Sequence, residues 1–283
     1  MLTPSQLQRF KDQGYVIIED AVPGGMLGPL REATGRVTER TRRGEWPHRR
    51  KAGEDDIWGV SHLLHPDIGE PVFADYVASP VVIEVVGDLL GLKEGEHAAR
   101  LQLELVNMLV NPAKRDFEIG WHRDLIREDL PPEEELAELR RLQHGVQWNT
   151  ALYDEACLFI VPASHLRPKT PEERDVVFNR SKDPMPGQMA VALRAGQGVY
   201  YNSNLLHRGV YSASQRRETL HCCMGSIDGF ALRRRQYLYR QLAWMDAPGF
   251  REGLPGPLLP LYDNFIRMKA RAEGIPNEER DDL

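Results

Sequence analysis

The segment Gly120-Trp-His-Arg-Asp124 places a histidine and a carboxylate one residue apart, shortly after a predicted strand over residues 101–110. A pair at a strand end can reach one ion if the backbone turns between the two side chains. A further histidine, His207, comes much later in the chain, after several more predicted strands. Two imidazoles and one carboxylate hold non-haem Fe(II) on one face and leave open positions for a co-substrate and O2. We therefore expect His122, Asp124 and His207 to bind a metal.

The His-x-Asp pattern is weak by itself, because the chain contains it twice. The second copy is His65-Pro66-Asp67. It lies in an irregular, helix-flanked stretch that no strand-rich segment precedes. We therefore interpret this second copy as a chance match and do not expect His65 to bind a metal.

Arg217 follows His207 by ten positions and stands at the start of a predicted strand. Alternation of period two separates two faces, with Arg217, Thr219 and His221 on one and Arg216, Glu218 and Leu220 on the other. A guanidinium that points into a barrel needs an anionic partner, because an unpaired buried charge is costly. The carboxylate of a co-substrate would supply one, and arginine suits it better than lysine. We expect Arg216 to be solvated or paired with Glu218, but the choice between the two arginines stays open.

Composition excludes several classes of protein. The 283 residues carry a net charge of −6 with Lys, Arg, Asp and Glu interspersed, which is not the charge pattern of a nucleic-acid surface. The cysteines are odd in number and form no zinc motif: Cys157, Cys222 and Cys223. The chain shows neither a signal-peptide pattern nor an apolar stretch of membrane-spanning length. We expect a cytoplasmic protein that acts on a small molecule, without nucleic-acid or membrane partners; a homodimer is compatible with the sequence.

The chain is helical at both ends and strand-rich between them. The predicted helices cover residues 3–13, 25–43, 71–91, 131–143, 231–242 and 257–273. The predicted strands cover residues 15–18, 101–110, 146–152, 157–161, 189–193, 198–201 and 219–224. Residues 44–70 are predicted to be irregular and residues 167–188 to form a mobile polar loop. We found no repeat or linker, so we expect one domain over residues 1–283: a helical part to about 95, a core over about 100–228 and a helical part over about 230–275.

Several short segments, taken in their order along the sequence, resemble the phytanoyl-CoA dioxygenase family of Fe(II)- and 2-oxoglutarate-dependent oxygenases. The resemblance extends over nearly the whole chain. The matching segments are residues 2–16, 85–91, 121–124, 157–165 and 207–209. Three details depart from the family pattern. Pro-Ala-Ser-His stands at 162–165 for the usual Pro-Gly-Ser-His, Glu155-Ala156 stands for the usual Asn-Gly, and the interval from His207 to Arg217 is one residue shorter than is common.

The resemblance implies a mainly β fold with flanking helices, built on a double-stranded β-helix (jelly-roll, cupin-like) core. It implies that His122, Asp124 and His207 hold Fe(II), and that Arg217 pairs with the far carboxylate of 2-oxoglutarate, which chelates the iron. The activity implied is O2-dependent C–H oxidation of a small organic substrate such as a secondary metabolite, amino acid or acyl derivative. Hydroxylation is the default outcome, with desaturation or cyclisation open. Related halogenases lack the carboxylate, so Asp124 argues against halogenation.

Each of the further candidate site residues has both a functional and a structural interpretation. Asn107 and Gln147, or Asn149 in place of Gln147, could bind the co-substrate or substrate, or could be polar residues on half-exposed strands. Trp121 and Trp148 could line a pocket, although we expect core packing, and residues 125–143 and 167–188 could form a lid. The rival functions are a cupin-like metal enzyme that is not an oxygenase and a jelly-roll binding protein without turnover.

Overall fold

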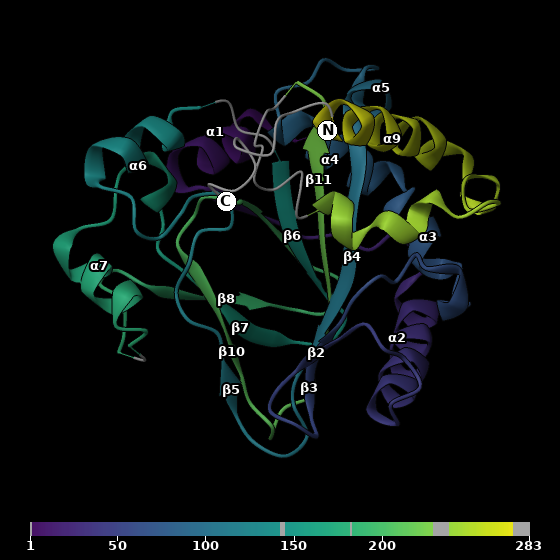
Figure 1. The fold of residues 1–283 in the computed structure, drawn as a ribbon, viewed down its shortest axis with the longest axis horizontal. Coiled ribbons are helices and arrows are strands. Elements are labelled where there is room, and N and C mark those ends of the chain that lie inside the picture. The colour runs from purple at the N-terminus through teal and green to yellow at the C-terminus, as the bar shows by residue number, and fades with distance from the viewer. Residues whose placement is uncertain (1, 142–144, 182, 229–237, 274–283) are drawn as a thin grey trace.

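Two antiparallel β-sheets form the centre of the molecule (Figure 1). This computed structural model describes residues 2–141, 145–181, 183–228 and 238–273. The larger sheet has the order β1 (Tyr15–Ile18), β9 (Gly198–Asn202), β6 (Gly145–Ala151), β11 (Glu218–Ser226), β4 (Leu101–Val110), β3 (Ile57–Val60) and β2 (Arg49–Lys51). The smaller sheet has the order β5 (Phe117–Glu118), β10 (His207–Tyr211), β7 (Glu155–Ile160) and β8 (Met189–Leu193).

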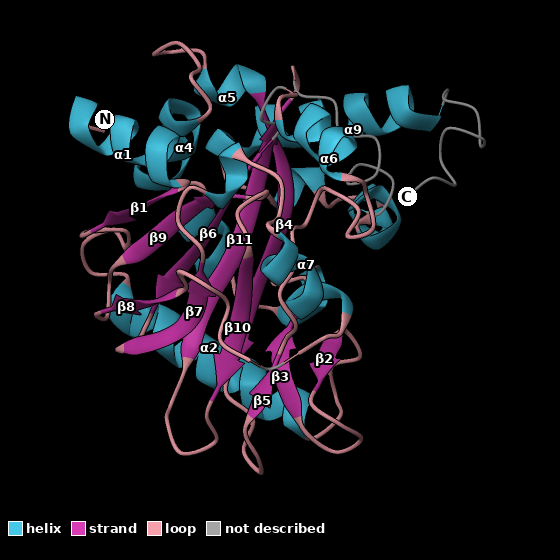
Figure 2. Cartoon of the chain, turned by 90° about the vertical axis from the view of Figure 1, so that its left-hand side faces the viewer, coloured by secondary structure: helices cyan, strands magenta, loops and turns pink. Residues whose placement is uncertain are grey.

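Helices cover the larger sheet and flank the smaller one. They are α1 (Pro4–Gln13), α2 (Leu27–Arg42), α3 (Val72–Val77), α4 (Pro80–Leu89), α5 (His97–Arg100), α6 (Pro132–Leu139), α7 (Pro171–Phe178) and α9 (Leu259–Glu273). Short 3-10 turns are η1 (Pro66–Ile68), η2 (Ser164–Leu166), η3 (Ala243–Asp246), η4 (Arg251–Gly253) and η5 (Gly256–Leu258). Figure 1 shows α6 and α7 on the left and α2, α3 and α9 on the right, and Figure 2, turned by 90°, shows α1, α4 and α5 at the top, above the strands. Within the described ranges no helix combines the length and the apolar character needed to cross a lipid bilayer.

Strand β11 separates the apolar core from the interior of the two-sheet barrel. Leu220 and Met224 belong to the main core cluster, which also contains Leu30 of α2 and Phe265 of α9. Because side chains alternate along a strand, the intervening residues face the other way. Arg217 and the residues of its face therefore point between the sheets, as the alternation predicted.

The first helix begins and ends where the sequence predicted. The Thr3 side chain accepts the Gln6 backbone N–H, the Gln6 side chain accepts the Thr3 N–H, and Pro4 occupies the first turn. Gly14 ends the helix at φ 82°. A Cβ at this glycine would lie 2.6 Å from Nδ1 of His165, so both the backbone conformation and the space require glycine.

The secondary structure predicted for several segments was wrong in detail. Residues 167–188 contain α7, with a Thr170–Glu173 capping box, and so are not a structureless loop. Residues 71–91 form two helices, because the chain breaks between α3 and α4 and Pro80 starts the second. The stretch 44–70, predicted to be irregular, contains the edge strands β2 and β3. Strands β5 and β10 were not predicted, and part of the predicted helix 231–242 lies outside the described residues.

Candidate active site

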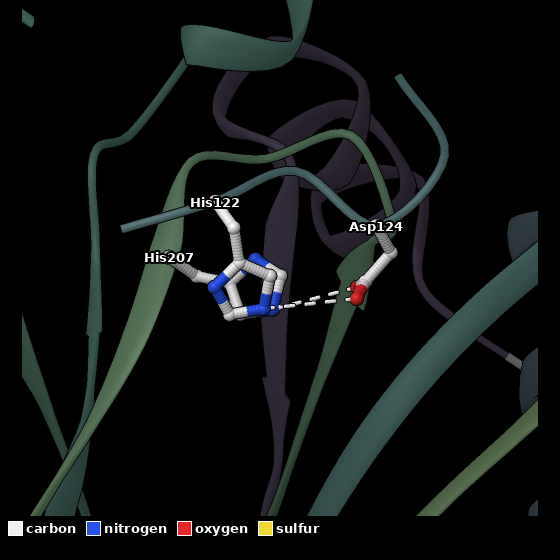
Figure 3. Close-up of side chains that lie close together, drawn as sticks. All are labelled: His122, Asp124 and His207. Atoms are coloured by element: carbon white, nitrogen blue, oxygen red, sulfur yellow. Dashed lines mark ion pairs between the residues drawn. The ribbon is translucent and has the colours of Figure 1, made fainter. Parts of the chain in front are cut away.

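His122 and His207 lie side by side although they are far apart in the chain. Each backbone N–H donates to the other residue's carbonyl, with N–O distances of 3.1 Å and 3.2 Å. The two imidazole rings lie 4.4 Å apart between centroids. Figure 3 shows the Asp124 carboxylate facing the two rings. The barrel therefore brings all three predicted ligand side chains together.

The ligand atoms have the spacing of a metal site. One atom from each of His122, Asp124 and His207 lies within 4.8 Å of the others. Nε2 of His122 is 3.7 Å from Oδ1 of Asp124, and Nε2 of His207 is 3.4 Å from Oδ2. Among the residues that the structure describes, this is the single cluster of its kind.

The same backbone contact orients both imidazoles. Nδ1 of His122 bonds the carbonyl of Gly120, and Nδ1 of His207 bonds the carbonyl of Leu205, each at 2.8 Å. A carbonyl only accepts, so each Nδ1 donates its N–H, and in a neutral imidazole of this tautomer Nε2 has a free lone pair. Burial, with a smaller contribution from His122, lowers the pKa of His207 to about 4. His207 is therefore neutral at pH 7, which is the form that binds a metal.

The second His-x-Asp copy forms no such cluster. Nδ1 of His65 accepts the backbone N–H of Asp67 at 3.1 Å and caps the short turn η1. The His65 ring packs against Trp46 and Trp244, with centroid distances of 5.3 Å and 4.9 Å. The contacts of His65 are structural, as we interpreted from the sequence.

Two cavities meet at His122 and Asp124, and His207 lines the inner one. The inner cavity has a volume of about 190 Å³ and the outer cavity about 590 Å³. Residues lining only the inner cavity include Arg50, Asn149, Tyr201, Tyr211 and Arg217. Residues lining only the outer cavity include Trp121, Glu128, Val177, Arg180, Cys223 and Arg240. The two share Leu105, Ile119, His122, Asp124, Gln147 and His221.

Arg217 points into the inner cavity and Arg216 does not. Arg216 packs over the Tyr153 ring, pairs with Glu218 at 3.0 Å and has a 60% exposed side chain. The side chain of Arg217 is 1% exposed, and its Nε lies 3.2 Å from both Thr219 Oγ1 and a Glu155 oxygen. The sequence did not predict Glu155 as a partner, and this residue gives Arg217 a carboxylate from the chain itself.

One edge of the Arg217 guanidinium is still unsatisfied. Its Nη1 is buried and has no hydrogen-bond partner. Burial would lower the pKa of Arg217, but Glu155 and Tyr211 outweigh that effect and raise it, so the group stays charged. A carboxylate in the inner cavity would satisfy the free Nη1.

Gln147, Asn149 and Asn107, which could bind the co-substrate or substrate, have different surroundings in the structure. Gln147 lines both cavities, and its Nε2 donates to Oδ2 of Asp124. Asn149 bonds Nδ1 of His221 at 2.8 Å. Asn107 accepts the backbone N–H of His62 at 2.9 Å and is not among the residues that line either cavity. The observed contact of Asn107 is therefore structural, and a role in co-substrate binding has no support.

The sequence also suggested two tryptophans as core or pocket residues and two segments as a lid. Trp148 is fully buried in the core, where its Nε1 donates to Tyr76 at 3.0 Å, whereas Trp121 lines the outer cavity. Residues 125–143 contribute Glu128 to the outer cavity, and residues 167–188 contribute Val177. Both segments thus contribute residues to the outer cavity, and their role as a lid stays a prediction.

Other residues that line the inner cavity were not predicted as site residues from the sequence. His221 could have been found, because period two places it on the face of Arg217. Arg50, Tyr201 and Tyr211 gave no local signal, since they come from strands at distant sequence positions.

A family model described as "Phytanoyl-CoA dioxygenase (PhyH)" matches residues 10–218. The chain belongs to the phytanoyl-CoA dioxygenase family. As a member of this family it is a non-haem iron- and 2-oxoglutarate-dependent dioxygenase. The resemblance seen in the sequence motifs is thus confirmed.

Solved structures share the fold at low sequence identity. EctD from S. alaskensis with 2-oxoglutarate and 5-hydroxyectoine has 16% identity and a TM-score of 0.61, covering 81% of this chain and 77% of its own. EvdO2 from Micromonospora carbonacea var. aurantiaca with 2-oxoglutarate has 18% identity and a TM-score of 0.54, covering 80% and 91%. The epimerase SnoN with Fe3+, alpha ketoglutarate and nogalamycin RO has 16% identity and a TM-score of 0.52, covering 78% and 82%.

These likenesses confirm the predicted jelly-roll core with flanking helices. A comparison with curated protein sequences found no match. Within the phytanoyl-CoA dioxygenase family the fold is therefore established, while the substrate has to be inferred from the site.

Proposed function

We propose that the protein couples oxidative decarboxylation of 2-oxoglutarate to oxidation of a C–H bond in a small organic substrate. His122, Asp124 and His207 would hold the iron, and Arg217 would bind the distal carboxylate of 2-oxoglutarate. The observation that carries this proposal is the convergence of the three ligand atoms within 4.8 Å beside a cavity that contains the buried guanidinium of Arg217.

The residues present suit both groups. Two neutral imidazoles and one carboxylate are the donor set of a facial iron site with open positions. The unpartnered Nη1 of Arg217 suits an anionic group in the inner cavity. A volume of about 190 Å³ lies below the 300–1,000 Å³ typical of drug-sized ligands, whereas about 590 Å³ lies within that range. We therefore assign the inner cavity to the co-substrate and the outer cavity to the substrate.

The chain positions the reactants and protects the site from water. Bound iron would supply the activation of O2 by which the substrate is oxidised. Gln147 orients the Asp124 carboxylate, and the two Nδ1 contacts hold both imidazoles in place. Trp121, Leu105 and Ile119 give the outer cavity apolar walls, which favour an organic substrate and exclude water. Hydroxylation is the default outcome, with desaturation or cyclisation also open.

An anaerobic titration tests this proposal. Fe(II) and 2-oxoglutarate added to the wild-type protein should produce the visible absorption of the chelate, and O2 should then release succinate. Asp124→Ala and His207→Ala should lose both signals while keeping the far-UV circular dichroism of the wild type. Asp129→Ala is the matched control, since Asp129 is exposed and pairs with Arg127. Full activity of either ligand variant would overturn the assignment.

We also propose that the chain is a single cytoplasmic domain acting without nucleic-acid partners. Strand β1 pairs with β9, and Asn264 of α9 donates to the carbonyl of Leu101 in β4 at 2.7 Å, so β1 and α9 both contact the core. All three cysteines are buried and none of them forms a disulfide, which suits a reducing compartment. Sedimentation of the purified protein would decide whether it forms the homodimer that the sequence allows.

A further inference from the structure

The inner cavity contains a second arginine, Arg50 of strand β2. It differs from Arg217 in one respect that matters for binding an anion. Arg217 has a carboxylate partner in Glu155, whereas no carboxylate among the described residues lies within ion-pair distance of Arg50. The two cations therefore do not contribute equally to the charge of the cavity.

Glu155 is a buried counter-charge for Arg217. Their side chains are 2% and 1% exposed, and Nε of Arg217 lies 3.2 Å from Oε2 of Glu155. Glu155 also accepts the Cys157 backbone N–H at 2.8 Å and the Thr219 hydroxyl at 3.3 Å, so its carboxylate is held in place. A carboxylate ligand beside this pair would gain the free Nη1 as a donor but would also approach the negative charge of Glu155.

The position of Arg50 is determined by the strand next to it. Arg50 is opposite Gly59 of β3 in the ladder, and its stem passes over that glycine. A Cβ at residue 59 would lie 3.2 Å from Cδ of Arg50 and 3.1 Å from the Met108 carbonyl. The absence of a side chain at Gly59 thus leaves room for Arg50 to enter the cavity.

Each of the two guanidiniums packs against an aromatic ring, and the two rings are neighbours. Arg50 lies 5.0 Å from the Trp58 ring, and Arg217 lies 4.8 Å from the Tyr211 ring. The two rings are themselves 5.6 Å apart. Burial and then the charge of Arg50 lower the pKa of His221 to about 3, which agrees with Arg50 facing the cavity. The two cations therefore border one small space.

The charges of the occupied site do not balance without Arg50. Doubly charged iron and Asp124 leave one positive charge, and 2-oxoglutarate brings two negative charges. The Glu155–Arg217 pair adds none. One negative charge would then remain in a largely buried space, where it is costly. Arg50 supplies the missing positive charge.

We propose that Arg50 is a second co-substrate-binding residue, which provides the net positive charge for the distal carboxylate of 2-oxoglutarate while the Glu155–Arg217 pair orients it. This inference rests on the proposed function. It assigns to a residue of β2 a part of the affinity that Arg217 alone would otherwise carry.

The test is anaerobic binding of 2-oxoglutarate to the Fe(II) protein, followed by visible absorption and by calorimetry. Arg50→Gln should raise the Kd by about tenfold or more, because a charge-assisted contact is lost. Arg49→Gln removes the same charge from the neighbouring position, which does not line the inner cavity, and should leave the Kd unchanged. 2-Oxobutyrate, which lacks the distal carboxylate, should bind both variants as it binds the wild type.

A double-mutant cycle with Glu155→Gln tests the charge balance directly. Glu155→Gln frees the charge of Arg217, so the loss caused by Arg50→Gln should be smaller in that background. An unchanged Kd in Arg50→Gln would overturn the inference and leave the proposed function intact. Loss of Fe(II) binding in Arg50→Gln would also overturn it, because the effect would then not be specific to the co-substrate. Failure of the wild type to bind 2-oxoglutarate would instead refute the proposed function.

Discussion

Gln147 donates a hydrogen bond from Nε2 to Oδ2 of Asp124, and so strand β6 of the larger sheet fixes the carboxylate that faces the two imidazoles. Asp124 itself belongs to the segment after β5 of the smaller sheet. The orientation of the one acidic ligand thus depends on the relative position of the two sheets.

Gln147→Leu should weaken Fe(II) binding about 10- to 100-fold, which is typical when a partner of a metal ligand is removed. The apolar side chain keeps similar bulk but cannot donate the hydrogen bond that Gln147 gives to Asp124. Fe(II) affinity measured by anaerobic competition with a chelator would show the loss. Gln215→Leu, at an exposed position, should bind Fe(II) as the wild type does; equal affinity in the two variants would contradict the role of Gln147.

Arg217→Lys and Arg216→Lys should differ sharply, although the two positions are adjacent. Lysine cannot reproduce the fork that contacts Glu155, Thr219 and a ligand together, so Arg217→Lys should raise the Kd for 2-oxoglutarate about tenfold or more. Arg216→Lys should leave it unchanged, because that side chain faces Glu218 and Tyr153. The reverse order of effects would identify Arg216 as the binding residue.

Glu135→Gln should destabilise the protein by about 3–5 kcal/mol, because it leaves buried cations without their counter-charge. The Glu135 carboxylate contacts Arg123 at 3.1 Å, Lys169 at 2.6 Å and Arg174 at 2.7 Å. Urea unfolding would measure the loss. Glu134→Gln, an exposed neighbour on α6, should change stability little.

The same variant should also weaken Fe(II) binding. Arg123 stands between the ligands His122 and Asp124 and points away from them, toward Glu135 and the carbonyls of Ser164 and Arg167. Loss of that partner should loosen the ligand segment. Unaltered iron affinity in Glu135→Gln would show that the ligand segment does not depend on α6.

His62 should make the metal-free protein less stable in weak acid. Burial, with smaller contributions from His48, His65 and Arg50, lowers the pKa of His62 from 6.5 to about 4. The unfolded chain therefore takes up a proton as the pH falls through 6.5, while the folded protein does not until about 4. Stability should drop by about 2 kcal/mol from this group between pH 7 and pH 5.

His62→Asn provides the comparison, since asparagine tolerates the φ of 67° found at this position. Urea unfolding of the wild type and the variant at both pH values isolates the contribution of His62. A wild-type pH slope no steeper than that of the variant would argue against a depressed pKa.

Local patterns in the sequence predicted much of the fold and the ligand set. Period two separated Arg217 from Arg216, and the strand over residues 101–110 was found with its bounds. The capping box of α7 was also visible as Thr170-Pro-Glu-Glu173, but the polar composition of that stretch suggested a loop. Helix α7 was thus missed although its start signal was present.

Contacts between distant segments could not be predicted in the same way. Glu155 begins β7 of the smaller sheet and Arg217 directly precedes β11 of the larger one, so the pair forms only when the two sheets pack together. Arg50 enters the cavity because β2 and β3 extend the larger sheet at its edge, and no local pattern near Arg50 predicts those strands. The contribution of such residues depends on sheet order, which a single sequence does not encode locally.

The backbone pair between His122 and His207 has a consequence for folding as well as for catalysis. It joins two segments that are distant in the chain, and an ion held by both side chains would turn this contact into a reversible cross-link. A ligand that binds only the native state adds to its stability according to its free concentration. The fraction of folded protein would therefore rise with the concentration of free Fe(II), and loss of the ion would leave more of the chain open to proteolysis.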